Sequence, residues 1–340
     1  MDLPQIPVID LQDRPLSHLA GLAPDKVRLL SASGKALTTG PVQAWMDRRS
    51  IAWLGRNITP YRDEIADIAA TTGVEGVHAL NISTEWACSS IAAGPRLMRT
   101  LDWPLHGMGP ALTLTRHDSR VGAWWQATWP GFVGVLTGLA PGRFAASYNQ
   151  PPIRVTTGVK ALDWVMERNR ASRRSAIPPT HLLRQVFEKA KDFDEATQML
   201  SETPTAIPAL FTLAGADGRS VVIERLEDRH RHRTSPNATA IANHWPDLPG
   251  HGGGWPKGWL RGVDSAGRFR DACVWVGGLR DALPTDFSWL QYPILNKFSR
   301  LAAMMDSTAG TFILVGLEQA GKSAVPATQV LRLDGLKSMG

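Results

Sequence analysis

The stretch Ala87-Cys88-Ser-Ser-Ile-Ala-Ala-Gly-Pro-Arg-Leu-Met-Arg99-Thr-Leu-Asp102 decides the fold of this chain. Small and apolar residues run from Cys88, a Gly-Pro pair makes a turn, and a second apolar run follows. The pattern predicts a β-hairpin that brings Arg99 and Asp102 back beside Cys88. Because strand residues alternate between two faces, positions 99 and 102 point to opposite sides. We therefore expect a bulge or a strand end between them.

The hairpin gives a cysteine the neighbours that its chemistry requires. A thiol with a pKa of about 8.5 is mostly protonated at neutral pH, so it needs a base or a positive neighbour. The α-amine of a chain that begins with cysteine has a pKa of about 7.7–8.0 and can accept the thiol proton. In such a chain Arg99 would stabilise the thiolate, and Asp102 would hold the amine and the guanidinium.

The rest of the chain alternates between helical and strand-like blocks. The first 80 residues have a helical pattern, with Thr59-Pro60 as the start of one helix and Gly73 as its end. Strand patterns follow, then helical ones, then strands again. The strands are expected near 88–93, 111–116, 123–129, 134–139, 144–149, 210–214, 220–224, 301–305, 311–315 and 330–333, and the later helices near 159–166, 182–190 and 193–200. Since no charged linker divides the chain, we predict one layered α+β unit.

Several motifs together resemble a known family. These are Cys-Ser-Ser-Ile from Cys88, Arg-x-x-Asp eleven residues later, and Asn-x-x-x-Glu from Asn81. The likeness continues in order through 61–69, 131–142, 208–215, 241–243 and 294–297. The chain resembles the acid ceramidase and N-acylethanolamine acid amidase family, which belongs with the cysteine N-terminal-nucleophile hydrolases, as do choloylglycine hydrolases and penicillin V acylases.

This resemblance implies a four-layer αββα sandwich and autocatalytic cleavage between Ala87 and Cys88. A helical fragment 1–87 would then stay associated with a catalytic fragment 88–340. Cys88 would be the nucleophile, its new amine the general base, and Arg99 and Asp102 its partners. Two further residues correspond to family positions: Asn243 to an oxyanion-hole side chain, and Asn149 to an asparagine at the end of a hairpin strand.

Two positions leave choices open. The family's site arginine corresponds to Arg268 or to its near neighbour Arg270, and we select Arg268. Gln150 stands where the named relatives have an acid, which affects how the leaving amine is held. Three other candidate site residues also have simpler interpretations. Arg99 and Asp102 could form a surface ion pair, and Asn243 could cap a turn.

The tryptophans at 124, 125 and 129 are open to two interpretations. They are either strand residues that pack a core or part of the lining of an apolar acyl pocket. Adjacent strand residues face opposite ways, so Trp124 and Trp125 cannot both line one pocket.

A competing motif lies near the C-terminus. Gly316-Leu-Glu-Gln-Ala-Gly321-Lys322-Ser323 satisfies the phosphate-loop pattern and follows an apolar strand, which would suggest a nucleotide-binding protein. A phosphate loop, however, needs a helix after it, and Ala-Val-Pro326 follows instead. We therefore interpret 316–323 as a connection between two terminal strands.

The composition limits the kinds of molecule that the chain is expected to bind. The net charge is +6, but the basic residues are scattered and do not alternate with aromatics, so no nucleic acid is expected. Two cysteines, Cys88 and Cys273, fit a reducing cytoplasm, and we expect Cys273 to pack in a core. We expect neither a secretory signal nor a stable membrane insertion. The pair His230 and His232 has no third ligand at a suitable spacing, so neither a metal nor any other cofactor is expected.

The sequence therefore predicts hydrolysis of a linear N-acyl amide with an apolar acyl chain, through a thioester on Cys88. An acyltransferase using the same thioester remains an alternative. So does a non-catalytic relative that binds lipid or an anionic surface through its basic, tryptophan-rich exterior. The oligomeric state and the preferred acyl chain and amine are left open.

Overall fold

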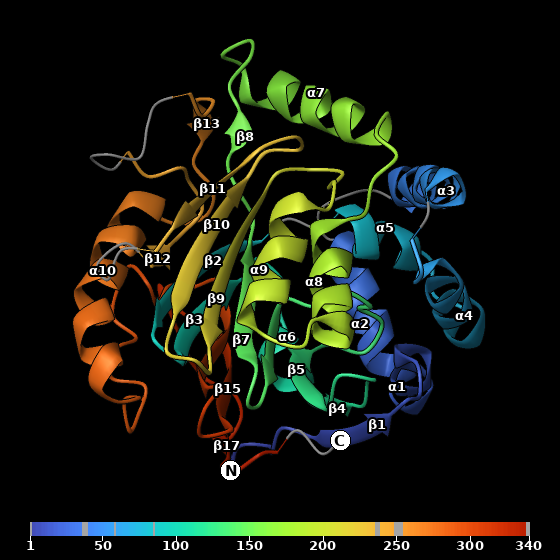
Figure 1. Cartoon of the computed structure of the whole chain (residues 1–340). Coiled ribbons are helices and arrows are strands. Elements are labelled where there is room, and N and C mark those ends of the chain that lie inside the picture. The colour runs from blue at the N-terminus through green and yellow to red at the C-terminus, as the bar shows by residue number, and fades with distance from the viewer. Residues whose placement is uncertain are drawn as a thin grey trace.

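Two large β-sheets form the centre of the computed structural model of this chain, which describes residues 2–35, 40–57, 59–83, 86–234, 239–247 and 254–337 (Figure 1). The eight-stranded sheet contains, in spatial order, β1 (Val8–Gln12), β4 (Thr113–His117), β5 (Trp124–Thr128), β6 (Thr137–Ala140), β7 (Phe144–Asn149), β9 (Ala209–Gly215), β10 (Ser220–Arg225) and β11 (His230–Arg233). The strands from β4 to β11 are antiparallel to their neighbours, and β1 runs parallel to β4 at the edge.

The second sheet carries the hairpin that contains Cys88. Its strands are β12 (Ala240–Ile241), β2 (Ala87–Ala93), β3 (Arg96–Asp102), β14 (Ser299–Asp306), β15 (Thr311–Ala320) and β16 (Ser323–Pro326), and β17 (Leu331–Leu333) also pairs with β15. Strands β2 and β3 contact β7 and β9 of the first sheet, so the two sheets lie face to face. The strands predicted along the chain are confirmed to within a few residues, except that 134–136 precede β6 and Ala111 ends a short helix.

Helices cover the two outer faces. On the eight-stranded sheet, α8 (Pro179–Lys189) contacts β7, and α9 (Phe193–Glu202) contacts β9 and β10. On the seven-stranded sheet, α10 (Ser265–Asp281) contacts β2, β3 and β12. The order of layers is therefore helix, sheet, sheet, helix (Figure 1), which confirms the predicted αββα sandwich.

The two inner layers are held by apolar packing from both sheets. The largest cluster of buried residues includes Cys88, Leu97, Leu101, Ala146 and Leu213 from strands of both sheets. A second cluster lies between the seven-stranded sheet and α10, where Ile91 and Met98 face Ala272 and Val276. Half-buried Cys273 packs at the border of this second cluster, as the sequence predicts.

The segment before Cys88 is mostly helical, with one exception. Its helices are α1 (Leu16–Leu22), α2 (Pro24–Lys35), α3 (Gly40–Arg56), α4 (Arg62–Thr72) and α5 (Val77–Ser83). The prediction of helix throughout the first 80 residues is wrong for 8–12, where β1 pairs with β4. Pro4 and Pro7 interrupt any helix there, and the β-branched pair Val8-Ile9 suits a strand.

The predicted start of α4 is also wrong, because the helix begins at Arg62 and Tyr61 is its N-cap residue. Thr59 lies outside the helix, and its hydroxyl is 3.2 Å from Nδ1 of His181 on α8. Gly73 ends the helix in the left-handed conformation, with φ +63°, as its sequence position predicts.

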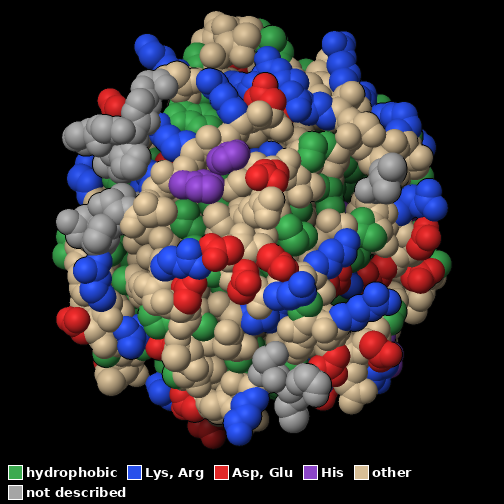
Figure 2. All heavy atoms as spheres, viewed as in Figure 1, with side chains coloured by type: hydrophobic (Ala, Val, Ile, Leu, Met, Phe, Trp, Pro, Cys, Tyr) green, Lys and Arg blue, Asp and Glu red, His purple; other side chains and the backbone are tan. Residues whose placement is uncertain are grey.

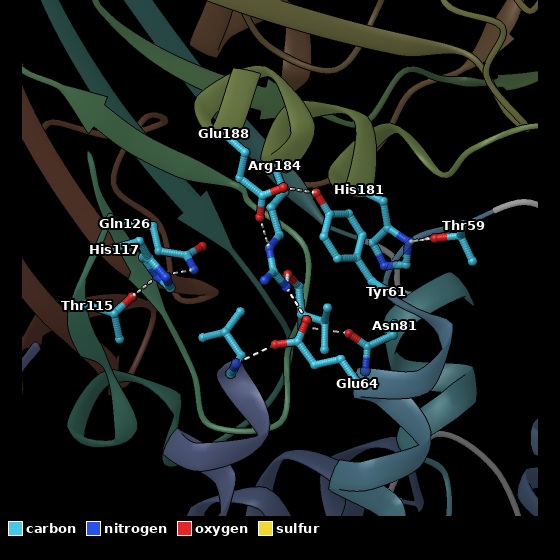
Figure 3. A network of polar contacts seen from close by, with 12 residues as sticks. Thr59, Tyr61, Glu64, Asn81, Thr115, His117, Gln126, His181, Arg184 and Glu188 are labelled. Atoms are coloured by element: carbon cyan, nitrogen blue, oxygen red, sulfur yellow. Dashed lines mark hydrogen bonds and ion pairs between the residues drawn. The ribbon is translucent and has the colours of Figure 1, made fainter. Parts of the chain in front are cut away.

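A buried polar network joins the N-terminal helices to α8 (Figure 3). The Arg184 guanidinium forms ion pairs with Glu64 at 2.6 Å and with Glu188 at 2.8 Å. The hydroxyl of Tyr61 donates to Glu188 at 2.7 Å, and the same guanidinium lies 4.2 Å from the centre of the Tyr61 ring. Of these four residues, Tyr61 and Glu64 precede Cys88 in the chain, and Arg184 and Glu188 follow it.

Two features of the surface bear on the sequence predictions. In α7 (Lys160–Ser172) the apolar residues Leu162 and Val165 are about half exposed rather than buried. Basic and acidic side chains intermix over the face shown in Figure 2, as their scatter in the sequence indicates. Among the described residues, no helix has both the length and the apolar character needed to cross a bilayer.

The phosphate-loop-like motif is part of a β-hairpin. Residues up to Ala320 belong to β15, the turn contains Gly321, and β16 begins at Ser323 and pairs back onto β15. A phosphate loop presents backbone amides at the start of a helix, and a strand follows here instead. The absence of a following helix is as predicted, but the interpretation of 316–323 as a loop is wrong for most of its residues: 316–320 extend β15, and only the turn before Ser323 connects it to β16.

Candidate active site

The hairpin predicted around Cys88 is present with a regular register. Cys88 pairs with Leu101, Ser90 with Arg99 and Ala87 with Asp102. Paired residues in an antiparallel ladder point to the same face of the sheet. Cys88, Ser90 and Arg99 therefore share the inner face, which packs against the eight-stranded sheet.

The thiol of Cys88 is buried next to a guanidinium. Nη2 of Arg99 lies 2.9 Å from Sγ of Cys88, and Nη1 of Arg99 donates to the carbonyl of Leu136. Burial raises the pKa of the Cys88 thiol, and the charge of Arg99 opposes that rise. Arg99 is thus a buried partner of the thiol, not part of a surface ion pair.

Asp102 lies on the other face of the sheet, at the end of β3. Its carboxylate accepts hydrogen bonds from Nδ2 of Asn296 at 2.7 Å and from the hydroxyl of Ser299 at 2.8 Å. The hairpin has no bulge between Arg99 and Asp102, because its register is continuous as far as Asp102, the last residue of β3. A register shift occurs instead in the neighbouring strand β14, between Ser299 and Leu301. Asp102 thus stands beside Ala87 and does not reach the Arg99 guanidinium. Burial raises the pKa of Asp102, whereas the charge of Arg268 opposes the rise.

Two side chains hold the backbone of Cys88: Asn243 binds its N–H, in the peptide group with Ala87, and Arg268 binds its carbonyl, in the peptide group with Ser89. Oδ1 of Asn243 accepts the backbone N–H of Cys88 at 2.7 Å and also Nη2 of Arg268 at 2.9 Å. Arg268 donates to the carbonyl of Cys88 and, at 3.1 Å, to the hydroxyl of Ser89. Asn243 is therefore the hydrogen-bond acceptor for the backbone N–H of Cys88 and not a turn cap.

The Asn243 amide nitrogen has a different partner. Nδ2 donates to the backbone carbonyl of Gln150 at 2.8 Å. An oxyanion hole requires a donor directed at the reacting carbonyl. In the intact chain this amide instead joins the nitrogen of Cys88 to the strand end at Gln150.

Helix α10 carries both candidate arginines, and they differ in burial. Arg268 lies in its first turn, fully buried, and its Nε donates to the carbonyl of Val263 at 2.7 Å. Arg270, two residues further on, is exposed. The side chain of Asp264 caps the helix by accepting the N–H of Gly267, which fixes where the first turn begins.

Asn149 stands at the end of β7, one layer away from the thiol. Its Oδ1 accepts the hydroxyl of Ser90 at 2.7 Å, and its Nδ2 donates to the carbonyl of Ala242 at 3.1 Å. Asn149 therefore fixes the segment that carries Asn243 against the strand that carries Cys88. The structure brings Cys88, Arg99, Asn243 and Arg268 into one bonded group, with Asn149 behind it and Asp102 beside it.

Two serines near the site, Ser90 and Ser147, were not selected from the sequence, whereas Gln150 was noted there only through the family resemblance. The hydroxyl of Ser90 lies 2.9 Å from that of Ser147, and Oε1 of Gln150 accepts the N–H of Trp86 at 2.7 Å. Strand alternation from Cys88 indicates Ser90, because residues two apart share a face. Ser147 belongs to β7 of the other sheet and Gln150 directly follows that strand, and no local pattern relates either residue to Cys88.

A cavity of about 370 Å³ reaches the edge of this group of residues. Its walls are mostly apolar, with Trp45 and Trp53 from α3, Trp164 and Val165 from α7, and Pro151-Pro152 after β7. Gln150 and Arg261 line the end nearest the site: the carbonyl of Gln150 accepts Nδ2 of Asn243, and that of Arg261 accepts Nη2 of Arg268.

The three tryptophans at 124, 125 and 129 lie in the core and do not line this cavity. Trp124 stacks on His117 with ring centres 4.1 Å apart, and Trp125 lies on the opposite side of β5 near Arg116. Trp129 donates its indole N–H to the carbonyl of Met108 at 2.7 Å. Of the two interpretations, core packing holds.

No group of histidine, cysteine and carboxylate side chains suited to a metal ion occurs among the described residues. His230 and His232 are exposed on β11, with ring centres 5.0 Å apart.

The known proteins that match this chain in sequence are acid ceramidases. The acid ceramidase of Heterocephalus glaber is 26% identical over 212 residues, which are 55% of this chain and 52% of that protein. The human acid ceramidase is 25% identical over 213 residues with the same coverage. The chain thus matches about half the length of these relatives. No protein-family model matches the sequence.

Two similar solved structures each give a TM-score below 0.5. An N-acylethanolamine-hydrolyzing acid amidase ortholog from Caenorhabditis elegans gives a TM-score of 0.48 at 18% identity, covering 65% of this chain and 93% of that one. Penicillin V acylase from Agrobacterium tumefaciens gives 0.44 at 13% identity, covering 73% and 86%. The sequence matches confirm the resemblance to acid ceramidases that the residues around Cys88 indicate.

Proposed function

We propose that this protein is a self-processing cysteine amidase that hydrolyses linear N-acyl amides. One observation carries the proposal: the Cys88 thiol contacts a buried guanidinium, while the nitrogen and carbonyl of the same residue are held by Asn243 and Arg268. A cysteine that serves only as core packing requires none of these polar contacts. The sequence relatives, named as acid ceramidases, support the same reaction class.

The first reaction is on the chain itself. Sγ of Cys88 attacks the carbonyl carbon of Ala87, the C–N bond between the two residues breaks, and the thiol proton passes to the departing nitrogen. Water then adds to the resulting thioester, which releases the carboxylate of Ala87 and restores the thiol. The products are fragments 1–87 and 88–340, and Cys88 becomes an N-terminal residue with a free amine.

The second reaction repeats these steps on a substrate. The free amine of Cys88 accepts the thiol proton, Sγ attacks the amide carbonyl, and the protonated amine of the substrate leaves. Arg99 favours the thiolate, Asn243 holds the cysteine nitrogen in its position as base, and Arg268 with Asp102 completes the charged face behind it. Asn243 becomes able to donate to a developing oxyanion only if its amide leaves the carbonyl of Gln150.

The substrate that we propose is a small N-acyl amide with an apolar acyl group. The mostly apolar walls of the 370 Å³ cavity beside Gln150 favour burial of hydrocarbon. Both cysteines are free thiols, which fits a reducing compartment, and we propose the cytoplasm.

Intact-mass measurement of the purified chain tests self-processing. We expect the masses of 1–87 and 88–340, a single uncut mass for Cys88→Ala, and release of free acid from N-acyl amides only by the processed form. Cys273→Ala, which changes the other cysteine, should process and hydrolyse as the wild type does. An active wild-type chain that remains uncut would contradict the proposal, and so would an active Cys88→Ala variant.

A further inference from the structure

The side chain just before the proposed cleavage site has one very close neighbour. Ala87 is 7% exposed, and its methyl group points to the face of β2 opposite the sulfur of Cys88, because adjacent strand residues alternate. On that face Gly262 packs against it. A side chain at position 262 would begin with a Cβ that overlaps Cβ of Ala87 and lies 3.0 Å from Nη2 of Arg268. The space between positions 87 and 262 therefore holds one methyl group and no more.

The loop that carries Gly262 is fixed in place by one buried guanidinium. The carbonyl of Arg261 accepts Nη2 of Arg268 at 3.0 Å, and the carbonyl of Val263 accepts Nε of Arg268 at 2.7 Å. Gly262, between these two residues, has φ +70°, a left-handed conformation that favours glycine. The next residue, Asp264, caps α10. Because both neighbours of Gly262 bind Arg268, the loop cannot retreat from Ala87 without breaking those hydrogen bonds.

The same guanidinium holds the residue that follows the cleavage site. Arg268 donates to the carbonyl of Cys88 and also to Oδ1 of Asn243, which accepts the N–H of Cys88 at 2.7 Å. Gly262 thus contacts the residue before the bond, and Arg268 holds the residue after it. Attack of Sγ of Cys88 on the carbonyl carbon of Ala87 requires one relative orientation of the two residues. A larger side chain at position 87 or 262 would push the loop and Ala87 apart and change that orientation.

We propose that Gly262 is a positioning residue for self-processing. Its bare Cα fixes Ala87 beside the nucleophile, and the chain cuts itself efficiently only when positions 87 and 262 together carry no more than one methyl group. Gly262 takes no part in the bond changes, which transfer the acyl group of Ala87 from the nitrogen to the sulfur of Cys88. This inference rests on the proposed function and adds a size requirement at two positions that are far apart in the sequence.

Four chains test the size requirement: the wild type, Gly262→Ala, Ala87→Gly and the double variant. The measurement is the fraction cut, by intact mass, at fixed times after cell-free synthesis. We expect Gly262→Ala to slow cutting by about ten-fold or more, because its methyl group overlaps that of Ala87. The same change should slow cutting far less when residue 87 is glycine. An equal effect of Gly262→Ala in the two backgrounds, or no effect in either, would overturn the proposal.

The overlap can also be made from the other side. Ala87→Val adds two methyl groups towards Gly262, and we expect it to slow cutting as Gly262→Ala does. Ala87→Val that cuts at the wild-type rate would show that position 87 is not limited in size, and would overturn the proposal.

A matched glycine separates the overlap from backbone strain. Gly142 has φ +75° in the turn between β6 and β7, and a Cβ at this position would meet nothing within 4 Å. Gly142→Ala therefore adds a similar strain without an overlap, and it should leave the rate of cutting nearly unchanged. If Gly142→Ala slows cutting as much as Gly262→Ala does, strain alone explains the effect and the role of Gly262 is refuted.

The outcomes also separate this inference from the function on which it rests. If the wild type cuts itself and hydrolyses amides while Gly262→Ala cuts equally fast, the function stands and the role of Gly262 fails. If Gly262→Ala slows cutting as expected but the cut wild type hydrolyses no amide, the role of Gly262 stands and the proposed amidase activity fails. A wild-type chain that never cuts itself would refute both.

Discussion

At the scale of single residues, the site depends on one guanidinium placed against one sulfur. Arg99 is buried, and besides Sγ of Cys88 it contacts the carbonyl of Leu136. Burial lowers the pKa of Arg99, whereas the nearby thiol and Asp102 oppose that change. A charge buried this deeply is costly unless it is compensated, so its position beside the thiol suits a group that becomes an anion during reaction.

Replacing Arg99 should move the pH at which the chain cuts itself. Burial already raises the pKa of the Cys88 thiol, and loss of the opposing charge in Arg99→Met should raise it further. Because processing needs the thiolate, its rate should reach half of its maximum at a correspondingly higher pH. Timed intact-mass measurements across pH give this profile. Arg99→Lys keeps the charge and should shift it less. Identical profiles for the wild type and Arg99→Met would show that Arg99 does not act on the thiol.

The sequence indicates the residues of the site that are close along the chain. Hairpin spacing places Arg99 on the face of Cys88, and the register confirms that placement. Asn243 and Arg268 lie 155 and 180 residues beyond Cys88, and only the family resemblance indicates them. Asp102 has its own partners because strand alternation turns it to the opposite face, which the spacing itself shows.

At the scale of helices and strands, a helix with a buried apolar face could be predicted from the sequence. A strand at the edge of a sheet could not. The apolar positions of α8, such as Leu183 and Phe187, are fully buried as their spacing predicts. The similar spacing in α7 marks exposed residues, because no other layer covers that helix to the same extent. Strand β1 could not be recognised since its partner β4 lies about a hundred residues later, and pairing at a sheet edge leaves little local signal.

Helix α8 is predicted to hold the two fragments together through Arg184. In the uncut Cys88→Ala chain, Arg184→Met leaves the buried carboxylate of Glu64 without its ion-pair partner. Removing one member of a buried pair costs about 3–5 kcal/mol, so the free energy of unfolding measured with urea should fall by about that amount. The matched control is Arg219→Met, which breaks exposed pairs with Asp194 and Asp217 and should lower the free energy of unfolding far less. Equal effects of the two changes would show that the Arg184 network contributes no more than a surface pair.

At the scale of the whole molecule, the proposed cleavage site between Ala87 and Cys88 does not coincide with a boundary in the core. Leu30, Leu80 and Trp86 pack into the largest apolar cluster together with residues of both sheets. A further cluster combines Val27 and Ile65 with Val133, which follows the cleavage. Because burial of apolar surface is the main favourable term in association, we expect fragments 1–87 and 88–340 to remain one particle after processing.

Acid should weaken this association, because a neutral histidine lies at the boundary between the fragments. His181 of the larger fragment meets the ring of Tyr61 edge to face at 5.4 Å, and burial lowers its pKa from 6.5 to about 3. When the fragments separate, the imidazole becomes exposed and regains its ordinary pKa, so separation takes up a proton below pH 6.5. Association is therefore fully stable above about pH 6.5 and loses stability as the pH falls towards 3, by an amount on the order of 4 kcal/mol.

Gel filtration of the processed protein across this range should show fragment 1–87 separating as the pH falls. His181→Gln should weaken this dependence, and His230→Gln, a change at an exposed histidine, should not. Co-elution that is independent of pH down to about 3 would mean that His181 can take up a proton without loss of the contact with Tyr61.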